Sequence, residues 1–311
     1  MTLHLIVGSG AIGSVVARKL LEQGDDVRVV TRSGTGPDGA ERVAADASDA
    51  DRMAALAAGA SAIHNCVNPP YHRWVTDWPP IANALLGAAE RSGAVLVTLS
   101  NLYGYGPVDA PMTEDTPLAA TGTKGRVRAA MWRAAKAAHD TGRIRAAEAR
   151  ASDFYGPAVI SHLGDRFVPR VLAGRRPQLV QGDPAVPHSW TYVDDVATTL
   201  ITLATDERAW GRPWHVPTDR AVSAAAVAAR IAAIAGVPDP GVQVLPPIVV
   251  RMGGLFVPLL REMAEVRYQF TDPFVLDSSA AQATFGLAPT PLDDGLAATV
   301  AWWRSRQRAA A

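Results

Sequence analysis

The sequence GSGAIG at residues 8–13 constrains the fold of this chain more than any other feature. It follows the apolar run LHLIV (3–7) and opens VVARKLLEQG (15–24), whose apolar residues recur with helical spacing. The run VRVVT (27–31) comes next, so strand, glycine turn, helix and strand lie within about thirty residues. This order predicts a βαβ unit with parallel strands and the glycines at its turn.

The three glycines of this turn would have separate roles in binding a dinucleotide. Gly8 permits a tight turn, Gly10 lets the backbone approach a pyrophosphate, and Gly13 allows helix and strand to pack closely. The following helix offers unpaired N–H groups and positive partial charge at its N-terminus. We therefore expect the loop, including Ala11 and Ile12, to bind the pyrophosphate of a nicotinamide dinucleotide. A glycine turn without a ligand is the alternative.

The end of the second predicted strand bears on the choice of cofactor. An acidic residue there would bind the ribose 2′-hydroxyl of NAD, but this chain has Thr31 followed by Arg32. No carboxylate repels a 2′-phosphate, and a guanidinium can bind one through two hydrogen bonds. The sequence therefore favours NADP(H), with NAD(H) as the alternative cofactor. Arg32 could instead be a solvated surface residue without a role in binding. Asp46, at the end of the third predicted strand, is expected beside the adenine.

Strands and helices continue to alternate through the first half of the chain. Further strands are predicted at 42–46, 60–67, 94–100 and 143–150, and helices at 53–59, 80–93, 125–140, 193–204 and 223–236. The alternation predicts an α/β fold, a Rossmann-like doubly wound parallel sheet in residues 1–150. Proline and glycine interrupt the pattern afterwards. Residues 151–311 are expected to form mainly a smaller C-terminal substrate-binding lobe, with 191–206 packing back on the core.

Composition bears on environment and partners. Thirty basic and thirty acidic residues are balanced among 311, without a basic stripe that would favour nucleic acid or a membrane surface. The single cysteine, Cys66, excludes an internal disulfide, and with His64 alone it makes no zinc site. No apolar run is long enough to span a membrane, and the N-terminal residues lack signal-peptide features. We expect a cytoplasmic monomer or homodimer that binds a small-molecule substrate and no metal.

The chain resembles the extended short-chain dehydrogenase/reductases, the NAD(P)-dependent epimerase/dehydratases, over nearly its whole length. Besides the glycine turn and Lys124, the resemblance rests on YGPVDAPMTEDTPL (105–118), ARASDFYGP (149–157), TYVDDVA (191–197) and PFVLDSSAAQATFGLAP (273–289). These motifs are specific for the fold. They are less specific for the reaction, because the family reduces ketones and also epimerises and dehydrates sugars.

The resemblance implies three catalytic groups, of which this chain keeps one. A Ser or Thr polarises the substrate oxygen, a Tyr moves the proton, and a Lys four residues later lowers the tyrosine pKa and holds the nicotinamide ribose. Lys124 matches the lysine, but Ala120 stands at the tyrosine and Asn101 near the Ser or Thr. The chain is therefore an atypical member that needs another source of the proton.

Four sources of the proton remain open. Tyr103 lies on the loop after the fifth predicted strand, at the sheet edge where such folds bind ligands; its alternative role is packing against the loop glycines. Asn101 can hydrogen-bond a developing alkoxide but cannot protonate it. Tyr155 and Asp153 follow the next strand, where structural roles are equally open. A phenol of the substrate is the fourth source.

Further residues are assigned to the cofactor and the substrate. Asn65, Cys66, Val67, Ser152 and Tyr155, together with Lys124, are expected to contact the cofactor, with Cys66 a small buried residue rather than a nucleophile.

Tyr71 and Trp74 are expected to line an aromatic pocket, with a hydrophobic cluster under a long loop as the alternative. For Trp78 the hydrophobic cluster is favoured over the pocket. Asp153 stands where sugar-nucleotide members carry Asn, and His188-Ser189-Trp190 where they carry Arg-Asp-Phe. Asp153 would repel phosphate, and Trp190 suggests a flat apolar substrate.

The sequence thus predicts an NADP(H)-dependent oxidoreductase, a ketoreductase of an apolar or polycyclic small molecule. A nucleotide-sugar-type epimerase or isomerase with bound cofactor is one alternative. A non-catalytic NAD(P)-binding regulatory protein is the other, since the missing tyrosine permits it.

Overall fold

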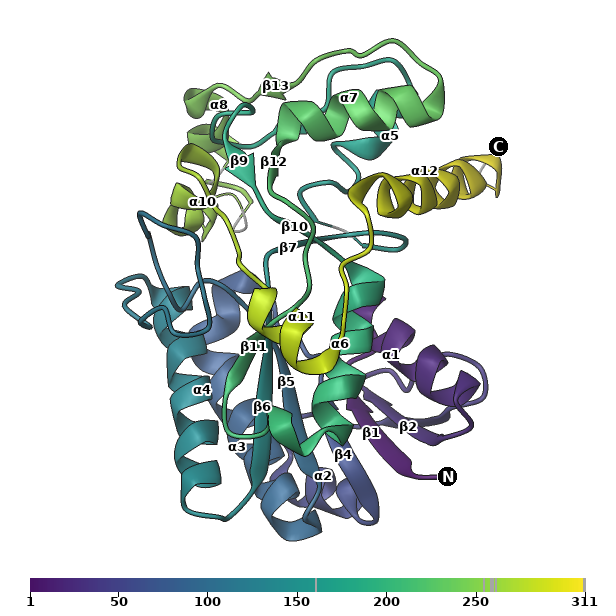
Figure 1. The fold of residues 1–311 in the computed structure, drawn as a ribbon, viewed down its shortest axis with the longest axis vertical. Helices are drawn as coiled ribbons and strands as arrows, with labels where there is room; N and C mark the ends of the chain where they lie inside the picture. Colours follow the sequence, from purple (N-terminus) through teal and green to yellow (C-terminus); the bar gives the residue numbers. More distant parts are fainter. Residues whose placement is uncertain (160, 254, 258–259, 261, 310–311) are drawn as a thin grey trace.

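A seven-stranded parallel sheet forms the centre of the structure, a computed structural model that describes residues 1–159, 161–253, 255–257, 260 and 262–309 (Figure 1). The strand order is β11-β6-β5-β4-β1-β2-β3, and every pairing is parallel. The strands are β1 (Leu3–Val7), β2 (Asp26–Thr31), β3 (Glu41–Ala44), β4 (Ala60–Asn65), β5 (Val95–Asn101), β6 (Arg145–Ala151) and β11 (Pro213–His215). The order reverses between β1 and β4, so the chain leaves these two strands in opposite directions and opens a crevice at their carboxyl ends.

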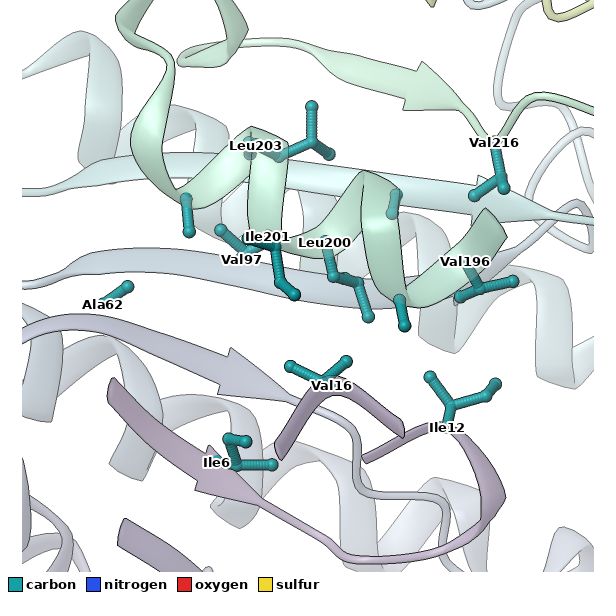
Figure 2. Packing of buried hydrophobic residues seen from close by; sticks show 14 of the residues in the cluster. Ile6, Ile12, Val16, Ala62, Val97, Val196, Leu200, Ile201, Leu203 and Val216 are labelled. Carbon is teal, nitrogen blue, oxygen red and sulfur yellow. The ribbon is translucent and has the colours of Figure 1, made fainter. Parts of the chain in front are cut away.

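Helices cover both faces of this sheet. One face carries α1 (Ala11–Glu22) and α6 (Val193–Thr205); the other carries α2 (Ala50–Ala57), α3 (Trp74–Ser92) and α4 (Thr123–Asp140). Successive side chains of β1 point to opposite faces, as a strand requires. Ile6 joins the core beneath α1 and α6, where it lies near Val16 and Leu200 (Figure 2), whereas Leu5 and Val7 join the core beneath α2 and α3.

The C-terminal part packs around a third hydrophobic cluster. In it, α7 (Ala224–Ala235) and α12 (Leu292–Ala309) lie against the short helix α5 (Val168–Leu172). The other short elements are β7 (Asp153–Tyr155), β8 (Gln178–Leu179), β9 (Pro187–His188), β10 (Trp190–Tyr192), β12 (Val222–Ser223), β13 (Gln243–Val244), α8 (Pro247–Gly253), α10 (Tyr268–Thr271), α11 (Ser279–Phe285), η1 (Tyr71–Arg73), η2 (Glu207–Ala209) and η3 (Met263–Val266). No helix among the described residues is long and apolar enough to cross a bilayer.

The structure confirms the predicted doubly wound α/β fold and changes two details of it. The seventh strand, β11, comes from residues 213–215, which carry no recognisable strand pattern in the sequence. Helix α3 begins at Trp74, not at residue 80, so Trp74 and Trp78 lie on a helix rather than on a long loop. The helix tolerates Pro79 and Pro80 because the carbonyl groups that lose their N–H partners belong to Val75 and Thr76, two exposed residues.

Candidate active site

The glycine turn after β1 is shaped by close backbone contacts. Gly8 has φ +96°, and a Cβ there would lie 2.7 Å from the Cys66 carbonyl oxygen at the end of β4. A Cβ on Gly13 would lie 2.0 Å from the Gly8 oxygen, so only glycine lets α1 approach the turn. A Cβ on Gly10 would meet no protein atom within 4 Å. Gly10 therefore faces open space, as the glycine that approaches a pyrophosphate must.

The N-terminus of α1 has the properties of an anion site. Gly10 is its N-cap and provides no side-chain hydrogen bond to the first turn, which contains no acidic residue. The N–H groups of this turn and the helix dipole are therefore available to a negative group. Gly10, Ala11, Ile12 and Gly13 all line the main cavity. These residues fit a dinucleotide pyrophosphate.

The end of β2 carries no acidic side chain. The Thr31 hydroxyl donates to the Thr35 carbonyl oxygen at 3.0 Å, and Arg32 is exposed beside it. Asp46 accepts hydrogen bonds from the Ser48 N–H and hydroxyl, which lower its carboxyl pKa; the nearby Arg32 charge acts in the same direction. Arg32 and Asp46 thus lie close together at the outer end of the expected cofactor site.

A cavity of about 630 Å³ extends from the glycine turn to the C-terminal part of the chain. It is walled by the carboxyl ends of β4, β5 and β6, by Asp153 and Phe154, and by residues of η3 and α10. The residues assigned from the sequence that line it are Gly10, Ala11, Ile12, Gly13, Cys66, Val67, Tyr71, Trp74, Asn101, Tyr103, Ser152 and Asp153. One continuous space therefore adjoins the predicted cofactor and substrate residues.

Other assigned residues lie outside this lining. Asn65 is buried at the end of β4, where its Oδ1 accepts a hydrogen bond from the Val67 N–H. Cys66, the next residue, does line the cavity, and burial raises the pKa of its thiol to about 12. Tyr155 is buried against Tyr192, with its hydroxyl beside Gly295 of α12.

Trp190 is also enclosed by the protein. Its indole N–H donates to the Val222 carbonyl oxygen at 3.1 Å, and its ring packs on His188. Its contacts are therefore with the C-terminal cluster rather than with the cavity.

Ala120, which the sequence analysis matched to the family's tyrosine, is closely packed. Its N–H donates to the Gly104 carbonyl oxygen at 3.1 Å, and a Cβ on Gly125 would lie 2.3 Å from the Ala120 Cβ. The same Gly125 Cβ would approach the Tyr103 carbonyl oxygen to 2.4 Å. The loop that carries Tyr103 therefore lies directly against the segment that contains Ala120 and Gly125.

Two phenols meet at the cavity wall beside this segment. The hydroxyl groups of Tyr103 and Tyr71 contact each other. Trp74 stacks on Tyr103 with ring centroids 6.0 Å apart and contacts the Tyr71 ring at 4.8 Å. Asn101 Oδ1 accepts a hydrogen bond from the Tyr103 N–H at 3.2 Å, which fixes the start of the loop. Because an oxygen must face that N–H, the Asn101 amide nitrogen is left as a donor.

Both phenols are held in their protonated form. Burial raises the pKa of Tyr103 well above its usual value, and the neighbouring Tyr71 reinforces the shift. Burial also raises the pKa of Tyr71 to about 12, although its hydrogen bond with Tyr103 acts in the opposite direction. Near neutral pH the pair therefore offers protons rather than a phenolate base.

Lys124 is buried under the segment that contains η3. Its Nζ donates to Glu262 Oε2 at 2.6 Å and to Glu265 Oε2 at 3.2 Å, and lies 5.5 Å from the Tyr71 ring centroid. Glu265 Oε1 also accepts the Lys124 backbone N–H at 2.6 Å. Lys124 is not among the residues that line the cavity, and its contact with a nicotinamide ribose remains a prediction.

Asp153 belongs to a polar cluster at the C-terminal side of the cavity. Its Oδ2 lies 2.9 Å from His188 Nε2, without the alignment of a linear hydrogen bond, and its Oδ1 lies 3.8 Å from His162 Nε2. Burial raises the carboxyl pKa, but His162 and His188 outweigh burial and leave it below its usual value. His188 Nδ1 donates a hydrogen bond to the Gln269 carbonyl oxygen at 3.0 Å. The other ring nitrogen, Nε2, faces the Asp153 carboxylate, and that contact is favourable when Nε2 also carries a proton.

His162 and Arg128 are among the residues that line the cavity and were not found from the sequence. Nothing in the irregular segment around His162 indicates which way its side chain points. Arg128 stands four residues after Lys124 on a predicted helix, so the two share a helix face. That spacing could have revealed Arg128.

Comparison with known proteins agrees with this architecture. Residues 4–216 match the sequence profile of the NAD dependent epimerase/dehydratase family. The chain therefore belongs to this family of enzymes. A comparison with curated protein sequences finds no match.

Solved structures share the fold at low sequence identity. UDP-glucose 4-epimerase from Thermotoga maritima, with UDP-glucose, has a TM-score of 0.81 and 20% identity, covering 98% of this chain and 100% of that one. dTDP-glucose 4,6-dehydratase from Bacillus anthracis, in complex with NAD, has a TM-score of 0.80 and 16% identity, covering 99% and 98%. UDP-glucuronic acid 4-epimerase from Bacillus cereus, also with NAD, has a TM-score of 0.79 and 17% identity, covering 98% and 99%.

Proposed function

We propose that the protein is an NADP(H)-dependent ketoreductase that acts on an apolar or polycyclic small molecule. The observation that carries the proposal is the contact between the Tyr71 and Tyr103 hydroxyls, in the cavity that begins at the glycine turn. These phenols lie beside the segment where Ala120 replaces the family's tyrosine, and burial keeps both protonated.

The dinucleotide would bind across the carboxyl ends of the first strands. The open space at Gly10 and the uncapped first turn of α1 support binding of its pyrophosphate. NAD is bound by the Bacillus anthracis and Bacillus cereus enzymes, which supports a nicotinamide dinucleotide here. The absence of an acidic residue at Thr31, with Arg32 next to it, supports the 2′-phosphorylated form.

When bound, the reduced nicotinamide supplies a hydride to a carbonyl carbon. Tyr103 would then donate its proton to the carbonyl oxygen as negative charge develops there. Tyr71 contacts the Tyr103 hydroxyl and would return a proton to it, and Tyr71, which is partly exposed, would in turn take a proton from solvent. The Asn101 amide nitrogen would donate a second hydrogen bond to the same oxygen. Trp74 and the phenol rings would pack on the flat body of the substrate and keep water from it.

The protonated phenols favour reduction over chemistry that begins with a base. An epimerase that first oxidises a hydroxyl needs a base that accepts the hydroxyl proton. The phenolate forms of Tyr71 and Tyr103 could act as that base, but the raised pKa values of both residues make the phenolates scarce. Epimerisation of a nucleotide sugar remains the second candidate because the Thermotoga maritima neighbour has that activity. Against it, the Asp153 carboxylate would repel a diphosphate in this part of the cavity.

Net oxidation of the cofactor separates these functions. Purified protein would be incubated with NADPH or NADH and a panel of aromatic and polycyclic ketones, while nicotinamide oxidation and product mass are followed. The ketoreductase proposal predicts stoichiometric formation of alcohol and oxidised cofactor. Conversion of a nucleotide sugar with no net oxidation would favour the epimerase, and saturable binding without turnover of either class would favour a non-catalytic role.

A further inference from the structure

Arg128 is a buried cation in the wall of the cavity. It lies on α4, is 7% exposed and lines the same space as Tyr71 and Tyr103. Its guanidinium carbon lies 4.7 Å from the Trp74 ring centroid and 4.4 Å from that of Trp78. The two indoles therefore hold the guanidinium in a fixed position through cation–π contacts.

Arg128 has no carboxylate of its own in the part of the chain that the structure describes. The acidic group that influences it, Glu148, is bonded to Arg150, whose Nε lies 2.6 Å from Glu148 Oε1. Burial lowers the pKa of Arg128 to about 10, although Glu148 acts in the opposite direction, so the side chain stays charged near neutral pH.

Most of the hydrogen-bonding capacity of Arg128 is unused. Among the described residues, its guanidinium makes one protein hydrogen bond, from Nη1 to the Leu99 carbonyl oxygen at 3.3 Å. The buried Nε has no partner there. A buried charge and donor without partners are costly unless a ligand completes them, and a guanidinium is suited to carboxylates and other oxyanions.

We infer that Arg128 is an anion-binding group of the cavity and receives a negatively charged oxygen of the substrate. The ligand class is a flat apolar molecule bearing an oxyanion, either a carboxylate or an ionised phenol or enol. The inference rests on the proposed function only in taking this cavity as the substrate site. It adds a charge requirement that shape and apolar packing do not impose.

Matched probes that differ only in charge test the inference. Binding of naphthoate and naphthamide would be measured by quenching of tryptophan fluorescence, with and without NADPH, since Trp74 and Trp78 flank the guanidinium. A nitronaphthol and its methyl ether form a second pair, which distinguishes phenolates from carboxylates. We expect at least one anion to bind about tenfold more tightly than its neutral partner, as a charge-assisted hydrogen bond provides.

Three variants assign this preference to Arg128. We expect Arg128→Met to abolish it and Arg128→Lys, which keeps the charge but loses the planar fork, to reduce it to about threefold. Arg126→Met is the matched control, because Arg126 is an exposed arginine of the same helix; it should keep the full preference. Denaturant unfolding of each variant shows whether it is folded.

Equal binding of anion and neutral partner by the unmodified protein in both pairs would overturn the inference. So would an anion preference that survives in folded Arg128→Met. If Arg128→Met does not fold, an unchanged preference in Arg128→Lys would overturn it instead. Ketone reduction is not measured in this experiment. Failure of the anion site therefore leaves the proposed reductase standing, and lack of turnover leaves the anion site standing.

Discussion

The hydroxyl of Tyr71 contacts the hydroxyl of Tyr103, although the two residues follow different strands of the sheet. Tyr71 opens the short helix η1 after β4, and Tyr103 lies on the loop after β5. The parallel sheet brings these loops together because the carboxyl ends of its strands share one edge. The contact places two protonated phenols together at the wall of the cavity, where we propose that they supply the proton.

Gly10→Ala should separate cofactor binding from folding. Gly10 has φ −72° and an added Cβ would meet no protein atom, so we expect the free energy of unfolding to fall by no more than about 1 kcal/mol. Dinucleotide affinity should fall by about tenfold or more, because the methyl group would enter the space needed by the pyrophosphate. Calorimetric titration with NADPH and NADH measures the affinity. Unchanged affinity for both would show that the pyrophosphate does not bind at this turn.

Arg32→Ala should weaken NADPH binding and spare NADH. Loss of a guanidinium that pairs with a 2′-phosphate costs about tenfold or more in affinity, whereas a 2′-hydroxyl loses little. Arg42→Ala is the control, since Arg42 is an exposed arginine nearby that pairs with Asp38. Equal affinities of the unmodified protein for the two cofactors, unaffected by either substitution, would contradict the predicted preference.

Lys124→Met should destabilise the fold because Glu262 and Glu265 would lose the cation with which they form ion pairs. The Lys124 side chain is 1% exposed, but the Glu262 and Glu265 side chains are 24% and 25% exposed and keep some contact with water. We therefore expect a loss of about 2 kcal/mol in the free energy of unfolding, below the range for fully buried pairs. Adding Glu262→Gln and Glu265→Gln should restore part of it. If Lys124→Met is as stable as the parent protein, the ion pairs of Lys124 with Glu262 and Glu265 do not stabilise this segment.

Acid should weaken the fold through His215. His215 Nε2 faces the Tyr105 hydroxyl at 2.7 Å and its Nδ1 donates to the Asp277 carbonyl oxygen, so the ring is neutral in place. Burial is the main cause that lowers its pKa to about 4. The unfolded chain, with a histidine pKa of about 6.5, therefore binds more protons between these values, and stability is lost as pH falls.

The size of this loss can be measured by urea unfolding. From about pH 7 to pH 5, His215 alone should remove about 2 kcal/mol, and His64, whose pKa burial lowers to about 3, acts in the same direction. In His215→Gln the free energy of unfolding should fall less between these two pH values, and the difference should equal the His215 contribution. The same slope in the variant would mean that His215 is not held neutral.

Local patterns in the sequence were sufficient for the fold and identified several residues that line the cavity. The run from LHLIV through GSGAIG predicts the glycine turn because each glycine has a local steric reason, and the cavity is indeed lined by Gly10 and Gly13. Aromatic residues after the fourth strand predicted Tyr71 and Trp74 at the same cavity. Such inferences succeed because strand ends and helix starts are encoded by neighbouring residues.

Contacts between distant segments could not be predicted in this way. Lys124 pairs with Glu262, which is 138 residues away, and no pattern around either residue specifies the other. Trp78 was expected in a hydrophobic cluster under a long loop. It does lie in a hydrophobic cluster, but on a helix that begins at Trp74 and tolerates Pro79 and Pro80 on an exposed turn. Tertiary packing decided each of these features.

The rate of hydride transfer in Tyr103→Phe tests the central claim most directly. The measurement is single-turnover oxidation of bound NADPH by a ketone substrate at saturation, for the unmodified protein, Tyr103→Phe and Tyr71→Phe. We predict a fall of about 100-fold or more in Tyr103→Phe with cofactor binding retained, and a smaller fall in Tyr71→Phe, which keeps the donor. An undiminished rate in Tyr103→Phe would show that the proton has another source and would contradict the account.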